Sequence, residues 1–291
     1  MTEREPKSLQ ELNLMDRFLF DEVMDVPGMY QIAVSILLEN NVTILDKVHT
    51  EKEFRVSPKL RAVRLDVVGM DVDGRIYYTE MQQRNTGNLI KRSRYYQGQL
   101  DVSLLEPGSM DFNLLNDSCL ILIAPFDLFG RGLYRYTFCE VCQECPDLKI
   151  ADGALRVFIN TKGINCKDFS QEFLDFMDYL MNTTDENAAR TSSERVKAIH
   201  REVQKIRASE EMGVKYMQRW EERAYDRLEA RAEGRAEGKA EGKAEGKAEG
   251  KAVINMLNQA LIRDNRQEDL MRSAIDQEFQ EELLLEYHIS V

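Results

Sequence analysis

The 291 residues, 43% of them hydrophobic, are enough for one substantial core and an appendage. The formal net charge of −12 argues against a protein that binds nucleic acid over its whole surface. The longest apolar run, Cys119 to Phe126, is too short to span a bilayer. The charged, polar start carries no secretory signal, and five cysteines, an odd number, indicate a reducing compartment. We therefore expect a cytoplasmic protein with no membrane partner.

Residues 8 to 40 predict two helices separated by Val26-Pro27-Gly28. Ser8 and Glu11 form a capping box at the start of the first helix. Short strands are expected at 42 to 48 and 53 to 57. These elements lead into a central hairpin.

Residues 64 to 82 predict two strands joined by a tight turn, because apolar side chains alternate along both. Two acids, Asp66 and Glu80, interrupt these otherwise buried-looking strands. A buried carboxylate is costly unless it is compensated, and a metal ion is one group that compensates it.

The register of the hairpin decides whether the two acids meet. A two-residue turn moves Asp66 out of line with Glu80, whereas a three-residue loop places the two acids opposite each other. The sequence favours the loop, because Asp71 and Gly74 suit a type I turn followed by a left-handed glycine. The carboxylates then share a face, with Gln82 two residues along, and the pair suits Mg²⁺, which accepts one or two protein carboxylates.

Residues 88 to 105 predict a helix whose first turns are basic. Between Lys52 and Arg94 there are ten basic and five acidic residues, a local excess of +5. The side chains expected to hold nucleic-acid phosphates are Lys91, Arg92, Arg94 and Tyr95. The alternative is an amphipathic helix with an ordinary charged face.

Three more strands are expected, at 119 to 124, 133 to 138 and 155 to 160, which predicts a mixed α/β sheet with helices on its faces. Three cysteines with two-residue spacing lie between the last two strands: Cys139, Cys142 and Cys145. This spacing is compatible with zinc or an iron–sulfur cluster, but no fourth ligand is nearby except Cys166, and free thiols are the preferred interpretation.

The C-terminal part is predicted to be helical. A polar stretch at 182 to 187 ends a domain spanning 1–185, and a helical, coiled-coil-like segment follows at 190–252. Its end, 231 to 252, repeats (Arg/Lys)-Ala-Glu-Gly with period four, which suits a helix packed against a second copy of the chain. The alternative is a flexible tether. A small helical segment, 253–291, completes the chain.

An ordered set of motifs resembles the PD-(D/E)XK nuclease family transposases, also called the recombination-promoting nuclease family. The resemblance covers roughly the first 165 residues and rests on Leu14-Met15-Asp16-Arg17-Phe18-Leu19-Phe20, Arg64-Leu65-Asp66-Val67, Glu80-Met81-Gln82, Lys91-Arg92-Ser93-Arg94-Tyr95-Tyr96, Tyr136-Thr137-Phe138 and the segment from Val157 to Gly163. It implies a restriction-endonuclease-like mixed sheet flanked by helices. It also implies that glutamine takes the place of the usual lysine.

The resemblance implies a catalytic site made of Asp66, Glu80 and Gln82. The two acids would hold Mg²⁺, for which Mn²⁺ can substitute, and Gln82 would orient a water molecule or contact a phosphate oxygen without the charge of a lysine. In the wider superfamily an acid of the first helix can assist the metal, and the sequence offers three candidates without choosing among them: Asp16, Glu22 and Glu39.

We therefore expect a Mg²⁺-dependent DNA endonuclease linked to recombination or transposition, which forms homo-oligomers through its helical repeat. The alternative is a nuclease-like module that binds DNA without cutting it and oligomerises through the same tail. A third possibility is a domain that only assembles partners through the coiled coil.

Overall fold

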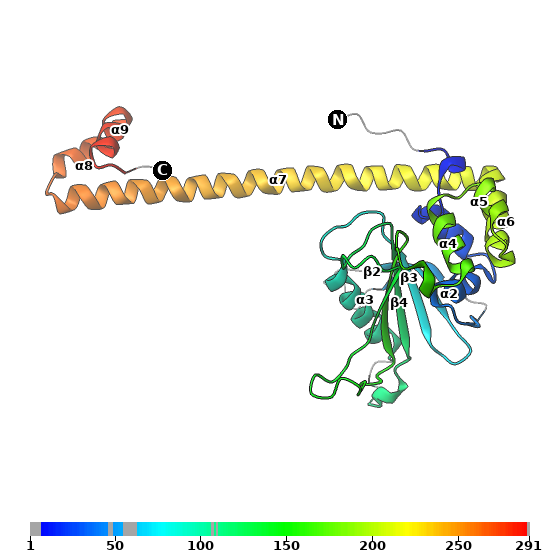
Figure 1. Cartoon of the computed structure of the whole chain (residues 1–291). Helices are drawn as coiled ribbons and strands as arrows, with labels where there is room; N and C mark the ends of the chain where they lie inside the picture. Colours follow the sequence, from blue (N-terminus) through cyan, green and yellow to red (C-terminus); the bar gives the residue numbers. More distant parts are fainter. Residues whose placement is uncertain (1–6, 46–48, 55–62, 106–107, 109, 290–291) are drawn as a thin grey trace. The chain divides into compact units, whose positions relative to one another are not determined.

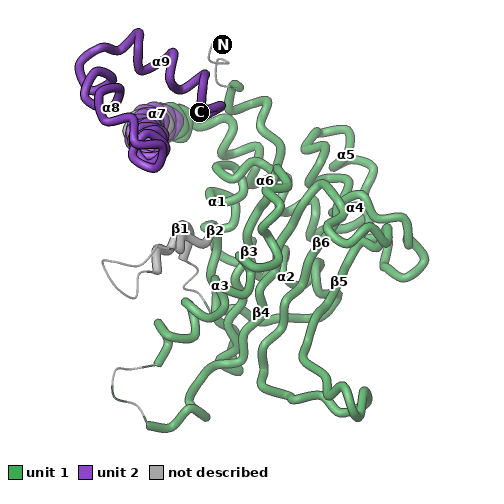
Figure 2. The backbone as a smooth tube through the Cα atoms, turned by 90° about the vertical axis from the view of Figure 1, so that its left-hand side faces the viewer, with its two compact units in different colours: residues 1–217 green, residues 218–291 purple. Residues whose placement is uncertain are grey.

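The computed structural model describes residues 7–45, 49–54, 63–105, 108 and 110–289. Contacts within the chain divide it into two compact units, Met1–Met217 and Gln218–Val291, coloured green and purple in Figure 2. No helix among the described residues combines the length and the apolar character needed to cross a membrane.

The first unit is built around a mixed sheet that has six strands within the described residues. Their order across the sheet is β1 (His49–Phe54), β2 (Val63–Met70), β3 (Ile76–Met81), β4 (Ser118–Ala124), β6 (Ala154–Asn160) and β5 (Arg135–Phe138). β1, β2 and β3 pair antiparallel, β4 pairs parallel with both β3 and β6, and β5 is antiparallel to β6. A parallel pair needs a crossover, and α3 (Leu89–Leu104) provides it between β3 and β4. The expected mixed α/β architecture is confirmed.

Helices cover both faces of the sheet (Figure 1). One face packs on α1 (Arg17–Met24), α2 (Met29–Leu38), α4 (Gln171–Met181) and α6 (Glu194–Ala208). Val67 and Tyr77 lie in this core, whereas their strand neighbours Val68 and Tyr78 lie in the second core, with Leu100 of α3. Because alternate side chains of a strand point to opposite faces, Asp66 and Glu80 belong to the face that carries α3.

The β2–β3 hairpin has the three-residue loop that the sequence predicts. Val67 lies opposite Thr79, and the backbone N–H of Asp71 donates to the carbonyl of Arg75 at 2.9 Å. Gly74 has φ +83°, the left-handed conformation that such a loop needs at this position. The same register, continued by one residue pair, sets Asp66 opposite Glu80.

The N-terminal region differs from the two uninterrupted helices expected. The Ser8–Glu11 capping box exists, but it starts a short 3₁₀ turn, η1 (Leu9–Glu11), and α1 begins separately, because the Asp16 side chain accepts the N–H of Phe18 and caps it. Of the strands expected at 42 to 48 and 53 to 57, residues 46–48 and 55–57 lie outside the described residues. Ile44 makes an isolated bridge to Asp71.

The first unit continues past the polar stretch at 182 to 187, where the sequence analysis ends its first domain. That stretch leads into α5 (Asp185–Arg190), whose first turn is capped by Thr184, and α6 follows. The apolar stripe of α6, interpreted above as coiled-coil-like, is buried in the core: Val196, Ile199, Val203 and Ile206. A stripe with 3-4 spacing fits a core-facing helix as well as a coiled coil.

The repeat lies within one long helix, α7 (Glu210–Arg263). The described side chains of the repeat are exposed, and no atom outside the helix lies within 4 Å of a Cβ built on Gly234, Gly242 or Gly250. In the second unit, α8 (Gln267–Ser273) and α9 (Gln277–Glu286) pack on the end of α7 through Leu257, Leu261 and Leu283. The C-terminal region is therefore helical, as expected.

Candidate active site

The two acids of the hairpin lie side by side and are buried. Asp66 is 1% exposed and Glu80 6% exposed. One oxygen of Asp66, Oδ2, accepts the backbone N–H of Met81 at 2.8 Å, which fixes its carboxylate against β3. The hairpin register thus brings together the two predicted metal ligands.

Each acid of the pair is held by an arginine from a neighbouring helix. Arg17, the first residue of α1, places Nε 2.5 Å from Asp66 Oδ1. Arg92, in the first turns of α3, places Nη2 2.8 Å from Glu80 Oε1. The sequence suggests a metal ion as one compensating charge; in the structure, two guanidinium groups compensate the pair.

Glu80 is more easily protonated than an ordinary carboxyl group. Burial is the main cause that raises the pKa of Glu80, to about 8; the charge of Asp66 acts in the same direction, and the positive charges of Arg92 and Arg17 act against both. A divalent cation beside Glu80 would favour its ionised form, as the two arginines do.

Gln82 lies just beyond the end of β3, next to the acids. Its backbone N–H donates to the carbonyl of Ile123 at 2.8 Å, and its side-chain Nε2 donates to Glu80 Oε1 at 2.5 Å. The side chain is partly exposed, so the amide faces both the acid pair and solvent. This position allows it to orient a water molecule or a phosphate oxygen there.

The predicted nucleic-acid residues on α3 separate into two groups. Arg92 turns toward Glu80 and lies over the ring of Tyr96, with 5.5 Å between Cζ and the ring centroid. Lys91, Arg94 and Tyr95 are exposed. Three of the four residues are therefore accessible to a phosphate backbone, while Arg92 contacts the acid pair.

The three candidate acids of the first helices have structural roles. Asp16 caps α1, Glu22 pairs with Lys215 at 2.7 Å, and Glu39 accepts the N–H of Ser170 at 2.7 Å. The acid that approaches the site is Asp21, which is 1% exposed and lies 3.8 Å (Oδ2) from Arg17 Nε.

Sequence reasoning did not identify Asp21. The sequence feature that could have identified it is its position four residues after Arg17, which places both side chains on the same side of α1. Arg17 thereby contacts two buried carboxylates, Asp21 on its own helix and Asp66 on β2.

The donor chemistry of the pair fits Mg²⁺ or Mn²⁺, which prefer oxygen ligands and keep several waters. Asp66 and Glu80 supply two adjacent carboxylates, the number that such an ion takes from a protein. Within the described part of the chain, no three His, Cys, Asp or Glu side chains converge as metal ligands. The pair therefore fits a hydrated ion held by two carboxylates rather than an all-protein cage.

The three spaced cysteines lie on the connection between β5 and β6, away from the acid pair in sequence. All are free thiols; Cys142 Sγ donates to Glu144 at 3.3 Å, and Cys145 Sγ to Asp147 at 3.1 Å. Each contact is to a nearby acid of the same loop.

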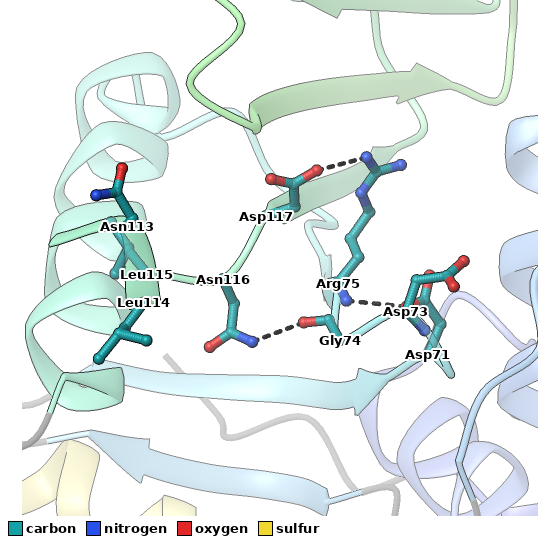
Figure 3. A pocket seen from close by; sticks show the side chains of 9 residues that line it. All are labelled: Asp71, Asp73, Gly74, Arg75, Asn113, Leu114, Leu115, Asn116 and Asp117. Carbon is teal, nitrogen blue, oxygen red and sulfur yellow. Dashed lines mark hydrogen bonds and ion pairs between the residues drawn. The ribbon is translucent and has the colours of Figure 1, made fainter. Parts of the chain in front are cut away.

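A cavity of about 540 Å³ lies beside the hairpin turn, at the opposite end of the strands from the acid pair (Figure 3). Its polar groups bond to one another: Asn116 Nδ2 donates to the carbonyl of Gly74 at 2.8 Å, and Arg75 pairs with Asp117 at 2.7 Å. These contacts join the turn to the segment that precedes β4.

Comparisons with models of protein families, with curated proteins and with solved structures give no match to this chain.

Proposed function

We propose that the chain is a Mg²⁺-dependent DNA endonuclease of the PD-(D/E)XK type, whose cleavage serves recombination or transposition. The observation that carries this proposal is the burial of Asp66 opposite Glu80 on adjacent strands, with Gln82 hydrogen-bonded to Glu80. The mixed sheet flanked by helices is compatible with the restriction-endonuclease-like fold that we propose. Five free thiols suit the reducing cytoplasm as its compartment.

The residues of the site have separate tasks. Asp66 and Glu80 would hold the ion, which supplies an activated water and neutralises charge on the scissile phosphate. Gln82 positions a water or a phosphate oxygen through its amide. It has no positive charge, so it stabilises the developing charge less than a lysine would.

DNA would reach this site along the N-terminal part of α3. Lys91, Arg94 and Tyr95 are exposed there, on the helix whose Arg92 contacts Glu80. Contacts from such side chains to phosphates fix the position of a duplex without reading its sequence. The substrate surface and the acid pair therefore share one helix.

Oligomers would form through the repeat of α7. Its period-four pattern sets an acidic row opposite a basic row, so a second copy can pair its basic row with the acidic row of the first. The alanine and glycine rows allow close approach of the two helices. We propose a homo-oligomer assembled on this segment.

A second candidate function, binding of DNA without cleavage, is favoured by one observation. Arg17 and Arg92 neutralise both acids within the chain. A protein that had lost catalysis would still need the acids as partners of these arginines, because an unpaired buried charge is costly.

Cleavage of supercoiled plasmid separates the two candidates. We expect nicking or linearisation by the wild type with Mg²⁺ or Mn²⁺, and its loss in Asp66→Ala and Glu80→Ala. The control is Arg75→Gln, which removes an ion pair at the other end of the same hairpin. DNA binding without metal-dependent cleavage would favour the second candidate, and equal cleavage by all variants would place the chemistry elsewhere.

A further inference from the structure

Arg17 pairs with Asp66, one of the two acids that we propose hold the metal. Its Nε lies 2.5 Å from Asp66 Oδ1, and Asp66 is 1% exposed. The other oxygen of that carboxylate is engaged by the N–H of Met81 at 2.8 Å. The contact with Arg17 therefore involves the oxygen that is not used by the backbone of β3.

The helix that carries Arg17 is firmly held in the first unit. Phe18 is 1% exposed and its ring centroid lies 5.0 Å from that of Tyr216; Glu22 pairs with Lys215 at 2.7 Å. Since both contacts join α1 to the start of α7, the helix backbone is a fixed support. The contact between Arg17 and Asp66 can then be broken only by movement of the Arg17 side chain.

The Arg17 side chain has both the room and the partner to move. It is 32% exposed, unlike the carboxylates it contacts. Asp21 lies one turn along the same helix, 3.8 Å (Oδ2) from Arg17 Nε and also 1% exposed. A guanidinium displaced from Asp66 can therefore keep its charge compensated by Asp21.

We propose that Arg17 is a displaceable counter-ion: it holds Asp66 in the metal-free protein, and a divalent cation binds the Asp66–Glu80 pair by driving Arg17 onto Asp21. This inference rests on the proposed metal-dependent function and adds its regulation. The affinity of the site for metal is set by competition between a divalent ion and the guanidinium of Arg17. Removing that competitor strengthens metal binding.

The test is calorimetric titration of the full chain with Mn²⁺ in the absence of DNA. We expect Arg17→Gln to bind Mn²⁺ about tenfold more tightly than the wild type, or tighter still, because one positive charge no longer competes. The matched control Arg75→Gln removes an arginine at the turn of the β2–β3 hairpin, away from the acid pair, and leaves the affinity unchanged. Asp66→Ala abolishes binding.

The outcomes separate this inference from the function on which it rests. If Mn²⁺ binding is lost in Asp66→Ala, but Arg17→Gln binds Mn²⁺ with the same affinity as the wild type or more weakly, the counter-ion proposal is overturned and the metal site is retained. Absence of Mn²⁺ binding in both the wild type and Arg17→Gln overturns both.

A second measurement covers the case in which Arg17→Gln does not fold. The Arg17 Nε–H resonance of the wild type, assigned by its absence in Arg17→Lys, is followed by NMR during titration with Mg²⁺. We expect it to shift in step with metal binding. Saturation of an Asp66-dependent Mg²⁺ site while this resonance stays fixed overturns the proposal.

Discussion

The carboxylate of Asp71 holds the turn that aligns the acid pair, so Asp71→Ala is expected to destabilise the first unit. Oδ1 accepts the N–H groups of Asp73 at 3.0 Å and Arg75 at 2.9 Å, and Oδ2 accepts the hydroxyl of Tyr77 at 3.0 Å (Figure 3 shows the turn). Asp71 is 7% exposed and Tyr77 is 4% exposed. Burial raises the pKa of Tyr77 to about 12, so its hydroxyl remains a donor at neutral pH.

The cost is unequal among these three bonds. Water can reach the turn amides, because Asp73 is exposed and Arg75 partly exposed, so each of those bonds contributes about 0.5–1 kcal/mol. The Tyr77 hydroxyl would be left buried without its acceptor, at about 1–3 kcal/mol. We therefore expect Asp71→Ala to lower the free energy of unfolding by roughly 3 kcal/mol in total.

The assay is urea unfolding of the full chain, followed by near-ultraviolet circular dichroism of the buried tyrosines. A double-mutant cycle of Asp71→Ala with Tyr77→Phe should give a coupling energy of about 1–2 kcal/mol. Asp71→Asn, which retains an acceptor for the two amides, should cost less than Asp71→Ala. A coupling near zero would refute the assignment of most of the cost to the buried hydroxyl.

Three further changes test other parts of the molecule. Gly69→Ala should cost about 1–3 kcal/mol of unfolding free energy, because its Cβ would lie 2.9 Å from the buried ring of Tyr30; urea unfolding measures it. Arg195 lowers the pKa of Glu172 below its ordinary 4.5, so this pair stabilises the protein above that pH and the effect is lost as the pH falls through the folded-state pKa. Glu172→Gln should therefore cost about 0.5–1 kcal/mol at pH 7 and progressively less as the pH falls below 4.5, measured by urea unfolding across this range. Lys91→Ala should weaken DNA binding equally across sequences and reduce the slope of log affinity against log salt by about 0.9, measured by fluorescence anisotropy.

Each of these changes has a result that would contradict its reasoning. Unchanged stability of Gly69→Ala would mean that the Tyr30 ring moves away at no cost. A pH-independent loss in Glu172→Gln would point to packing rather than charge. An unaltered slope of log affinity against log salt in Lys91→Ala would mean that Lys91 does not contact the phosphates.

The hairpin was predictable because its signals are local. Asp71 and Gly74 stand at the two positions that define a three-residue loop, and Gly74 adopts the left-handed conformation expected of it. Period-two alternation along both strands then fixes which side chains share a face. From these two facts the sequence places Asp66 opposite Glu80 without any knowledge of the rest of the fold.

The compensation of the acid pair was not predictable, because it depends on contacts that are distant in sequence. Arg17 lies 49 positions before Asp66, and nothing local indicates that α1 begins beside β2. Asp21 was missed for the same reason, since its burial follows from the packing of α1. Arg92 is predicted from the sequence to hold a nucleic-acid phosphate, but its contact with Glu80 depends on how α3 lies against β3.

The C-terminal end of the first unit could not be predicted from the sequence pattern either. Val196, Val203 and their neighbours repeat every three or four residues, which suits either a coiled coil or a helix on a core. The structure buries this stripe, and Arg207 donates to the carbonyls of Leu12 and Thr183 at 2.6 and 2.9 Å. These contacts join α6 to the N-terminal region and extend the unit to Met217.

The central claim is that Asp66 and Glu80 form a site for a divalent cation that serves hydrolysis. Crystals of the full chain soaked in Mn²⁺, measured at a wavelength where manganese scatters anomalously, test it most directly. We predict an anomalous peak between the two carboxylates, with Arg17 turned toward Asp21. Crystals that show no peak there, with Arg17 on Asp66 and Arg92 on Glu80, would contradict it.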